Sequence, residues 1–219
     1  MSTTEGSPMI LIGQYDSPFV RRVAVALHHY GLAFEHRPWS VWGNAAQIAQ
    51  YNPLRRVPTL LLDDGCALME TFAVLDYVDE LVPAERALAP RSGVARRDIL
   101  RIAALASGVA DKAVTLLYSA LDLMQPSPMW TERCRTQIVD SLAFLEAERA
   151  QRQSSYWFGE TLTHADIALA CSYRFTSEAH PGLISPARFP SISQAADRCE
   201  ALPEFKAAYL PITNNLTKS

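Results

Sequence analysis

Strand and helix patterns alternate along residues 9–82 of the chain. The apolar run at 9–12 is bounded by proline and glycine and predicts a short buried strand. Ser17 and Pro18 then open a predicted helix, because serine caps helix N-termini and proline is tolerated at the first helical position. Apolar residues recur at helical spacing until Gly31, a residue typical of a left-handed helix terminus.

The same region contains further apolar runs that predict three more strands and another helix, at residues 34–37, 59–62, 67–69 and 72–81. A turn at 63–65 joins the last two strands into a hairpin. With a short helix allowed before the third strand, the order is β-α-β-α-β-β-α. That order predicts an α/β domain in which helices pack against a mixed sheet.

The remainder of the chain carries only helical periodicity after a proline-containing linker at 83–92. Thr163 and Asp166 have the spacing of a capping box, which starts a helix and is a structural feature. Helices are predicted over 94–124, 130–151, from 163 onward, 191–202 and 204–209. We therefore expect an α/β domain at 9–82 and an all-helical domain at 93–212, with tails at 1–8 and 213–219.

Composition excludes several classes of function. The 219 residues include 20 basic and 23 acidic side chains, for a formal net charge of −3. This balance gives no global attraction to nucleic acid or to anionic lipid. No apolar run approaches the ~18 residues of a membrane span, and the first residues lack the pattern of a secretory signal. We expect a cytoplasmic protein without nucleic-acid or membrane partners.

The four cysteines are far apart in the sequence, at positions 66, 134, 171 and 199. None belongs to a Cys-x-x-Cys pair, and no histidine spacing complements them. This arrangement favours free thiols in a reducing compartment and predicts no metal site.

Ser17 carries the chemistry of greatest interest, because its hydroxyl lies where a strand passes into a helix. Helix N-termini hold unpaired N–H groups and about half a positive charge, so they favour anions. A thiolate placed there would gain from the helix end and from a serine hydrogen bond. Lowering a thiol pKa from ~8.5 by ~2 units raises the ionised fraction at pH 7 about 25-fold. Ordinary helix capping is the alternative interpretation, and the segment alone does not decide between them.

Three further features lie at the ends of predicted strands. Pro58 directly precedes a strand and is a candidate cis proline, which would leave the backbone before it free for a ligand. An ordinary trans proline at a strand start is the alternative, and general frequencies favour it. Thr71 follows a strand and opens a helix, so it could cap that helix while its N–H receives a carboxylate. Arg55 and Arg56 add positive charge beside the proline.

These segments together resemble the cytosolic glutathione transferases over nearly the whole chain. The matching pieces follow the family's order: 17–23 with Ser-Pro-Phe, 52–58 ending in Val-Pro, Glu70-Thr71 before a helix, and 163–166. The Ser-Pro-Phe form looks closest to serine-type members such as the plant tau class and their bacterial relatives. The resemblance implies a thioredoxin-like glutathione-binding domain at 9–82, a helical domain, a cytoplasmic homodimer and a role in detoxification.

The resemblance also assigns roles to residues, with glutathione as co-substrate and a small hydrophobic electrophile as partner. Ser17 would donate to the glutathione sulfur, and Val57 would pair its backbone with the cysteinyl part beside a cis Pro58. Glu70 and Thr71 would hold the γ-glutamyl end, and Arg56 would meet the glycyl carboxylate. Candidate aromatic residues for the electrophile pocket are Tyr15, Trp39, Trp42, Tyr118 and Trp130.

Other functions stay open at this level. The family usually has serine where this chain has Thr71, and no cysteine stands at position 17, which disfavours disulfide exchange. A transferase that adds glutathione to an electrophile is the leading hypothesis. A related peroxidase, dehalogenase or isomerase would use the same site, and a non-catalytic binding or regulatory protein could share the fold.

Overall fold

The computed structural model describes residues 9–121 and 125–212, which fall into two compact units. The first comprises 9–82 together with 207–212, and the second comprises the described residues of 83–206. The expected linker at 83–92 thus lies within the second unit, and residues 207–212 lie within the first.

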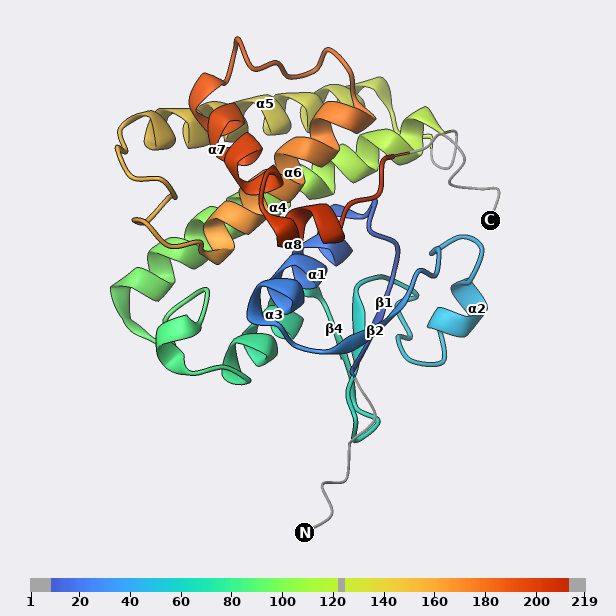
Figure 1. Cartoon of the computed structure of the whole chain (residues 1–219). Helices are drawn as coiled ribbons and strands as arrows, with labels where there is room; N and C mark the ends of the chain where they lie inside the picture. The colour runs from blue at the N-terminus through green and yellow to red at the C-terminus, as the bar shows by residue number, and fades with distance from the viewer. Residues whose placement is uncertain (1–8, 122–124, 213–219) are drawn as a thin grey trace. The chain divides into compact units, whose positions relative to one another are not determined.

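The first unit has the predicted element order β-α-β-α-β-β-α. Its elements are β1 (Met9–Ile12), α1 (Pro18–Tyr30), β2 (Phe34–Arg37), α2 (Ala45–Ile48), β3 (Thr59–Leu61), β4 (Ala67–Met69) and α3 (Thr71–Glu80). The strands form one sheet in the order β2-β1-β3-β4, with β1 parallel to β2 and the other pairs antiparallel. α1 and α3 lie together on one side of the sheet, and α2 lies on the other (Figure 1).

Helix α1 begins and ends at the residues that the sequence predicts. Ser17 is its N-cap, and Pro18 follows in the first turn. Gly31 takes the left-handed conformation (φ 69°) and donates its N–H to the carbonyl of His28. Only residues 13–17 separate the end of β1 from the start of α1, so this short loop sets where the helix N-terminus lies relative to the strand.

Polar contacts hold α1 to its neighbours in the first unit. The Tyr30 hydroxyl donates to Oδ1 of Asp79 at 2.6 Å, and the Arg22 guanidinium lies over the ring of Phe72, so α1 is tied to α3 twice. Arg21 donates from Nε to the carbonyl of Ala208 at 3.0 Å. That buried hydrogen bond ties the segment 207–212 to α1.

The loop after β1 contains a glycine that leaves no room for a side chain. A Cβ atom on Gly13 would lie 2.5 Å from Cγ2 of Val20 and 2.8 Å from Cβ of Val57. Its φ of 131° is also a conformation that L side chains rarely adopt. The first turn of α1 and the segment before β3 therefore meet at the end of β1, with Gly13 between them.

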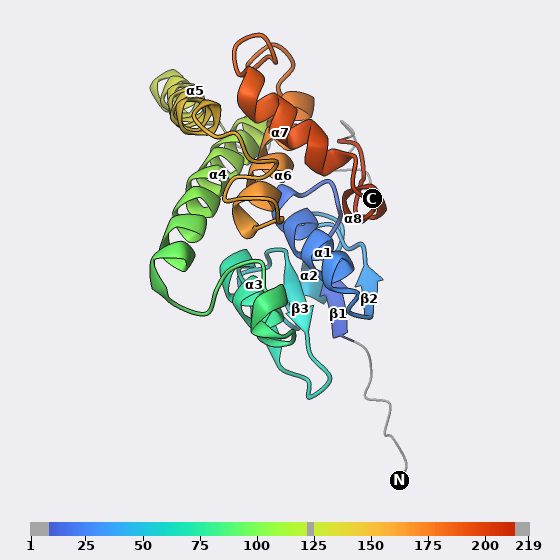
Figure 2. The ribbon, with the colours of Figure 1, turned by 60° about the vertical axis from the view of Figure 1, so that its left-hand side comes forward.

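The second unit is helical, as expected. It contains the short 3₁₀ helix η1 (Ala84–Arg86), the helices α4 (Gly93–Ala120), α5 (Pro128–Ala150), α6 (His164–Ala179) and α7 (Pro190–Glu200), and most of α8 (Pro203–Ala207). α4 packs against α5 and α6, and α6 packs against α7 (Figure 2). Buried Ala103, Ala106 and Ala168 form a core cluster of small residues, which allows α4 and α6 to approach closely. The predicted helix at 94–124 extends to Ala120, and residues 122–124 lie outside the described part.

The capping box predicted at the start of α6 is present. The carboxylate of Asp166 accepts from the N–H of Thr163 at 2.9 Å and from its hydroxyl at 2.7 Å. It also accepts from the N–H of Trp157 at 2.6 Å, and the Trp157 side chain is fully buried. One buried carboxylate thus starts the central helix and holds the loop that precedes it. No helix within the described residues combines the length and apolar character needed to cross a bilayer.

We expect Gly13→Ala to lower the free energy of unfolding by more than about 2 kcal/mol, because the new methyl group overlaps Val20 and Val57. Gly65→Ala is the matched control: its φ of 85° is also positive, but a Cβ there meets nothing within 4 Å. That control should lose only about 1 kcal/mol. Urea unfolding measures both, and equal losses would show that backbone conformation alone, and not the close approach, matters at Gly13.

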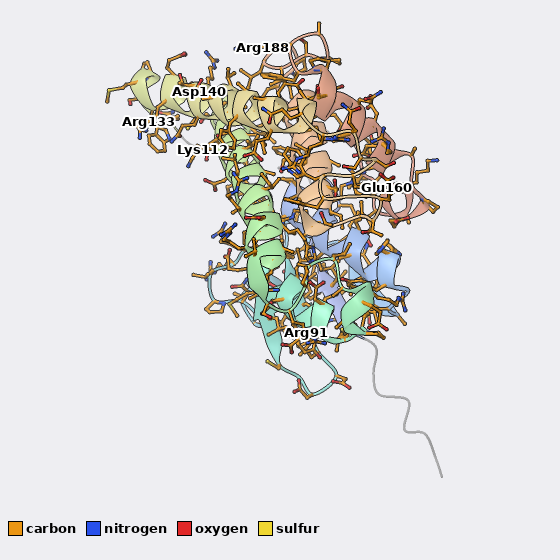
Figure 3. The ribbon with its side chains drawn as sticks, turned by 90° about the vertical axis from the view of Figure 1, so that its left-hand side faces the viewer. Arg91, Lys112, Arg133, Asp140, Glu160 and Arg188 are labelled. Atoms are coloured by element: carbon orange, nitrogen blue, oxygen red, sulfur yellow. The ribbon has the colours of Figure 1, made fainter. Side chains whose placement is uncertain are left out.

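We expect Asp166→Ala to cost about 3 kcal/mol, since it leaves three buried donors of Thr163 and Trp157 without their acceptor. Asp140→Ala on α5 removes an exposed carboxylate (Figure 3) and should change stability by less than about 0.5 kcal/mol. Tryptophan fluorescence during denaturant titration reports both variants. A small loss for Asp166→Ala would contradict the central role of its hydrogen bonds.

Candidate functional site

The site lies in the first unit, around the N-terminus of α1. Ser17 is half-buried, and its Oγ accepts a hydrogen bond from the N–H of Val20 at 3.4 Å. This is helix capping, but it uses only a lone pair of the hydroxyl. Within the described residues, nothing accepts the hydroxyl hydrogen of Ser17. The side chain can therefore cap the helix and donate to an anion at the same time.

The loop that carries Ser17 is anchored to the end of β2. Gly13 donates its N–H to the carbonyl of Arg37 at 2.9 Å, and its own carbonyl lies 2.8 Å from Nε2 of His36. The ring of Tyr15 stacks on His36, with 3.9 Å between ring centroids. Sequence reasoning missed Gly13 and His36 as supports of the site. The only local signal was the glycine that ends the first apolar run.

The second side of the site is the segment before β3. The Val57–Pro58 peptide bond is cis, in agreement with the proline that the sequence singled out. Among the described residues, no hydrogen bond uses the peptide N–H or C=O of Val57. Val57 is half-buried, so these two backbone groups can pair with the backbone of an extended ligand.

Asn52 organises this segment from a fully buried position. Its Nδ2 donates to the carbonyl of Arg56 at 2.9 Å and to Oγ1 of Thr59 at 3.0 Å, and its Oδ1 accepts from the N–H of Leu54. These hydrogen bonds span both ends of the turn that presents Val57. Asn52 was noted in the sequence only as part of a motif, and its supporting role is clear only from the structure.

The third side is the start of α3, where one expectation is corrected. Glu70, not Thr71, occupies the N-cap position, and Thr71 is the first residue of the helix. Glu70 has a φ of 69°, a left-handed conformation that a residue with a Cβ adopts only at a cost. This backbone turn leads into Thr71, which is 5% exposed and begins the helix, and the N–H groups at a helix start favour an anion.

Arg56 and Glu70, which the sequence separates by 13 residues, form an ion pair with Nη1 3.2 Å from Oε1. The pairing of Thr59 with Met69 across β3 and β4 places the residues before β3 next to those after β4. Both side chains are more than half exposed, so the pair contributes little to stability and can exchange partners easily. A cation and an anion thus stand side by side at the edge of the site.

Burial shapes the acid–base behaviour of nearby groups. It raises the pKa of Tyr15 above its ordinary value of 10.0, and it raises the pKa of Asp16 against backbone hydrogen bonds that lower it. Burial also raises the pKa of the Cys134 and Cys199 thiols. Those two cysteines are poor nucleophiles for that reason, whereas Ser17 offers a hydrogen-bond donor to an incoming thiolate.

The aromatic residues expected around an electrophile do not all belong to one unit. Tyr15, Trp39 and Trp42 lie in the first unit, and Trp39 packs on Tyr51 with ring centroids 6.2 Å apart. Tyr118 and Trp130 lie in the second, where Nζ of Lys112 stands 5.6 Å from the centroid of the Trp130 ring. In the part of the chain that the structure describes, no group of three or more His, Cys, Asp or Glu could hold a metal ion.

The arrangement can hold a small extended molecule that bears an anion or thiol, a peptide backbone and both a positive and a negative charge. The Ser17 hydroxyl could meet the anion or thiol, and the backbone of Val57 could pair with the peptide backbone. The exposed pair of Arg56 and Glu70 could meet the two charges.

Comparison with known proteins gives a consistent result. The family model for the N-terminal domain of glutathione S-transferases matches residues 11–86, and the model for the C-terminal domain matches residues 128–207. The uncharacterised GST-like protein YibF of Escherichia coli is 30% identical over 168 residues, which cover 75% of this chain and 80% of that protein.

Solved structures agree. A glutathione S-transferase from Methylobacterium radiotolerans, in complex with glutathione sulfonate, is 28% identical with a TM-score of 0.84 and covers 94% of this chain and 98% of its own. A glutathione transferase family member from Pseudomonas fluorescens with bound glutathione is 30% identical, with a TM-score of 0.77 and coverage of 93% and 100%. With both domains matched and the fold shared, this chain belongs to the cytosolic glutathione S-transferase family.

Proposed function

We propose that this protein is a glutathione transferase in which the Ser17 hydroxyl stabilises the thiolate of bound glutathione for attack on a small electrophilic substrate. The observation that carries the proposal is the double role open to Ser17. Its oxygen accepts from the N–H of Val20, while its hydrogen has no acceptor among the described residues.

The energy required is modest. Lowering the thiol pKa by ~2 units corresponds to about 2.7 kcal/mol. One hydrogen bond to a charged group contributes about 1.5–3 kcal/mol, and a helix N-terminus adds about 0.3–1 kcal/mol. Ser17 at the start of α1 provides both, so no metal or neighbouring base is needed to explain the ionisation.

The remaining contacts would orient the peptide. Val57 pairs its free backbone groups with the cysteinyl residue, beside the cis Pro58. Glu70 accepts from the γ-glutamyl ammonium, the N–H of Thr71 binds the γ-glutamyl carboxylate, and Arg56 binds the glycyl carboxylate. The ion pair between Arg56 and Glu70 opens to accept the two ends of the peptide, at small cost because both side chains are exposed.

The chemical step is attack by the thiolate sulfur on an electrophilic carbon. A carbon–sulfur bond forms. In a substitution, the bond to the leaving group breaks and the leaving group departs with its electron pair. In an addition to a double bond, the carbanion or enolate that forms takes up a proton from solvent. The protein contributes the ionised nucleophile and its position. Solved relatives with glutathione or glutathione sulfonate bound support glutathione as the ligand.

The direct test is a calorimetric titration with glutathione, followed by turnover assays with a panel of aryl halides, epoxides and conjugated carbonyl compounds. We expect micromolar to millimolar affinity and conjugation of at least one class. Tight glutathione binding without any turnover would leave the binding-protein alternative, and no binding would remove the proposal.

We expect Ser17→Ala to raise the pKa of the bound glutathione thiol by one to two units and to lower kcat/KM at pH 7 about 3- to 25-fold. A raised thiol pKa means less thiolate at neutral pH, so the rate deficit should shrink as the pH rises. Glutathione affinity should change less than about threefold, because the peptide's other contacts remain. Thiolate absorbance of the bound peptide and the pH–rate profile measure these effects.

The control separates catalysis from capping. Ser127 precedes Pro128 and caps α5 in the same way, with its Oγ accepting from the N–H of Trp130 at 3.2 Å. Ser127→Ala and Ser17→Ala should each cost about 1 kcal/mol of stability. Only Ser17→Ala should raise the thiol pKa. Ser17→Thr, which keeps a hydroxyl group, should return the thiol pKa most of the way to its value in the unmodified protein. An unchanged pH profile in Ser17→Ala would place the activation elsewhere.

We expect Glu70→Gln to weaken glutathione binding about tenfold, because it removes the charge that faces the γ-glutamyl ammonium while keeping the size of the side chain. Stability should change by less than about 1 kcal/mol, since the pair with Arg56 is exposed. Glu85→Gln, an exposed change on η1, is the control and should leave affinity unaltered. Calorimetry measures both, and equal affinities would show that Glu70 does not hold the peptide.

A further inference from the structure

His36 on β2 makes two contacts with the loop that carries Ser17. Its Nε2 lies 2.8 Å from the carbonyl oxygen of Gly13, and its ring stacks on that of Tyr15 with an interplanar angle of 5°. Both Gly13 and Tyr15 belong to residues 13–17, the loop between β1 and α1. A half-buried side chain of the neighbouring strand thus holds the segment that leads to the Ser17 hydroxyl.

The register of the sheet places His36 where it can make these contacts. β1 and β2 are parallel, and His36 pairs with Leu11 near the end of β1. Side chains two residues apart in a strand share a face of the sheet, so His36 and Phe34 lie on the same face. Phe34 contacts His28 of α1, with ring centroids 5.1 Å apart, which identifies this face as the one that α1 covers. His36 therefore lies on the side of the sheet on which α1 begins.

The carbonyl of Gly13 needs the donor that His36 provides. Gly13 is buried, its φ of 131° turns the chain out of β1, and no backbone N–H of the described residues donates to its carbonyl. A buried carbonyl without a donor is costly, and such groups are nearly always paired. Because a carbonyl oxygen only accepts, Nε2 of His36 carries the proton. The charged form of imidazole also donates from Nε2, so this hydrogen bond does not depend on the charge of His36.

The hydrogen bond at Gly13 acts on Ser17 through a short loop. Gly13 is held at both of its backbone groups, since its N–H donates to the carbonyl of Arg37 at 2.9 Å. The N–H of Ser17 donates to the carbonyl of Gln14 at 3.2 Å, which closes a turn over residues 14–17. Only three residues separate Gly13 from Ser17, so a displaced Gly13 carbonyl would change the direction of the hydroxyl.

We propose that His36 is a positioning residue for the thiolate: by donating to the Gly13 carbonyl, it fixes the direction of the Ser17 hydroxyl and thereby the ionisation of the bound thiol. The inference rests on the proposed role of Ser17 and extends it to a residue of the neighbouring strand. Hydrogen bonds weaken steeply as the donor turns away from the acceptor, so a small displacement of the loop removes part of the stabilisation of the thiolate. His36 acts through Ser17 and not by contact with the sulfur.

The test uses two substitutions that separate the donor from the ring. His36→Phe keeps an aromatic ring against Tyr15 but leaves the Gly13 carbonyl without a donor, whereas His36→Gln keeps an N–H donor near the position of Nε2. We expect His36→Phe to raise the pKa of the bound glutathione thiol by about one unit and to lower kcat/KM at pH 7 about threefold, a deficit that shrinks as the pH rises. His36→Gln should return the thiol pKa most of the way to its original value. Thiolate absorbance of the bound peptide measures both variants.

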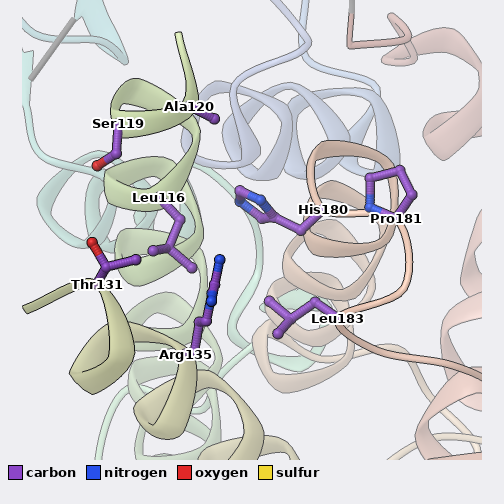
Figure 4. Close-up of a pocket in the computed structure, with 8 residues that line it drawn as sticks. All are labelled: Leu116, Ser119, Ala120, Thr131, Arg135, His180, Pro181 and Leu183. Atoms are coloured by element: carbon purple, nitrogen blue, oxygen red, sulfur yellow. The ribbon is translucent and has the colours of Figure 1, made fainter. Parts of the chain in front are cut away.

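His180 provides a matched control in the second unit. It lines a pocket of the helical unit (Figure 4), and its Nε2 lies 2.8 Å from the carbonyl oxygen of Ala113, the same kind of contact. His180→Phe removes that hydrogen bond and should leave the thiol pKa unchanged. Circular dichroism confirms that each variant is folded before titration. Equal pKa shifts in His36→Phe and His180→Phe would overturn the proposal, because a general loss of packing would then explain both.

The Ser17→Ala background shows whether the effect passes through Ser17. Residues that act through one set of contacts are not additive, so His36→Phe should add almost no further pKa shift to Ser17→Ala. The inference is overturned, with the role of Ser17 intact, if His36→Phe alone has no effect, if it adds its full shift in Ser17→Ala, or if His36→Gln fails to restore the thiol pKa. If Ser17→Ala itself leaves the thiol pKa unchanged, the proposed function fails and the role of His36 fails with it.

Discussion

The proposed thiolate site depends on the hydrogen-bonding capacity of one hydroxyl group at a helix N-terminus. Serine has lone pairs to accept and one hydrogen to donate. At Ser17 the N–H of Val20 uses a lone pair, which fixes the side chain against α1 and leaves its hydrogen without an acceptor among the described residues. Capping and thiolate stabilisation are therefore compatible uses of the same group. The capping contact also orients the donor, so that it need not be ordered when a ligand binds.

This donor is useful only if the other parts of the site are held close to it. Gly13 allows that approach, because a Cβ atom there would overlap Val20 on one side and Val57 on the other. Buried Asn52 fixes the turn that ends at Val57, and the pairing of β3 with β4 brings Glu70 to the same end of the sheet. Of the residues that would touch the peptide, Ser17, Val57, Arg56 and Glu70 are exposed or half-buried and Thr71 is buried, whereas Gly13 and Asn52, which position them, are buried or tightly packed. The buried residues of the first unit thus fix the positions of the groups at its surface.

Features set by local sequence were predictable, and features set by tertiary structure were not. Helix caps depend on residues only three or four positions apart, so the sequence alone places them. Those of α1 and α6 were placed correctly: Ser17 with Pro18, Gly31, and Thr163 with Asp166. The N-cap of α3 was misplaced by one residue, since the left-handed conformation of Glu70 is not a preference of glutamate. The ion pair of Arg56 with Glu70 follows from strand register, and the contacts of Gly13 follow from packing across three elements. No periodic pattern in the sequence indicates that these residues lie close together.

The charges beside the candidate site limit what it could select. Arg56 and Glu70 lie 3.2 Å apart and are both more than half exposed, so an anion that pairs with the arginine must compete with the carboxylate already there. A ligand that carries an ammonium group as well as a carboxylate can replace both partners of this ion pair, whereas a simple anion would leave Glu70 unpaired and would be repelled by it. Selectivity at such a site would therefore come as much from the group that repels as from the group that attracts.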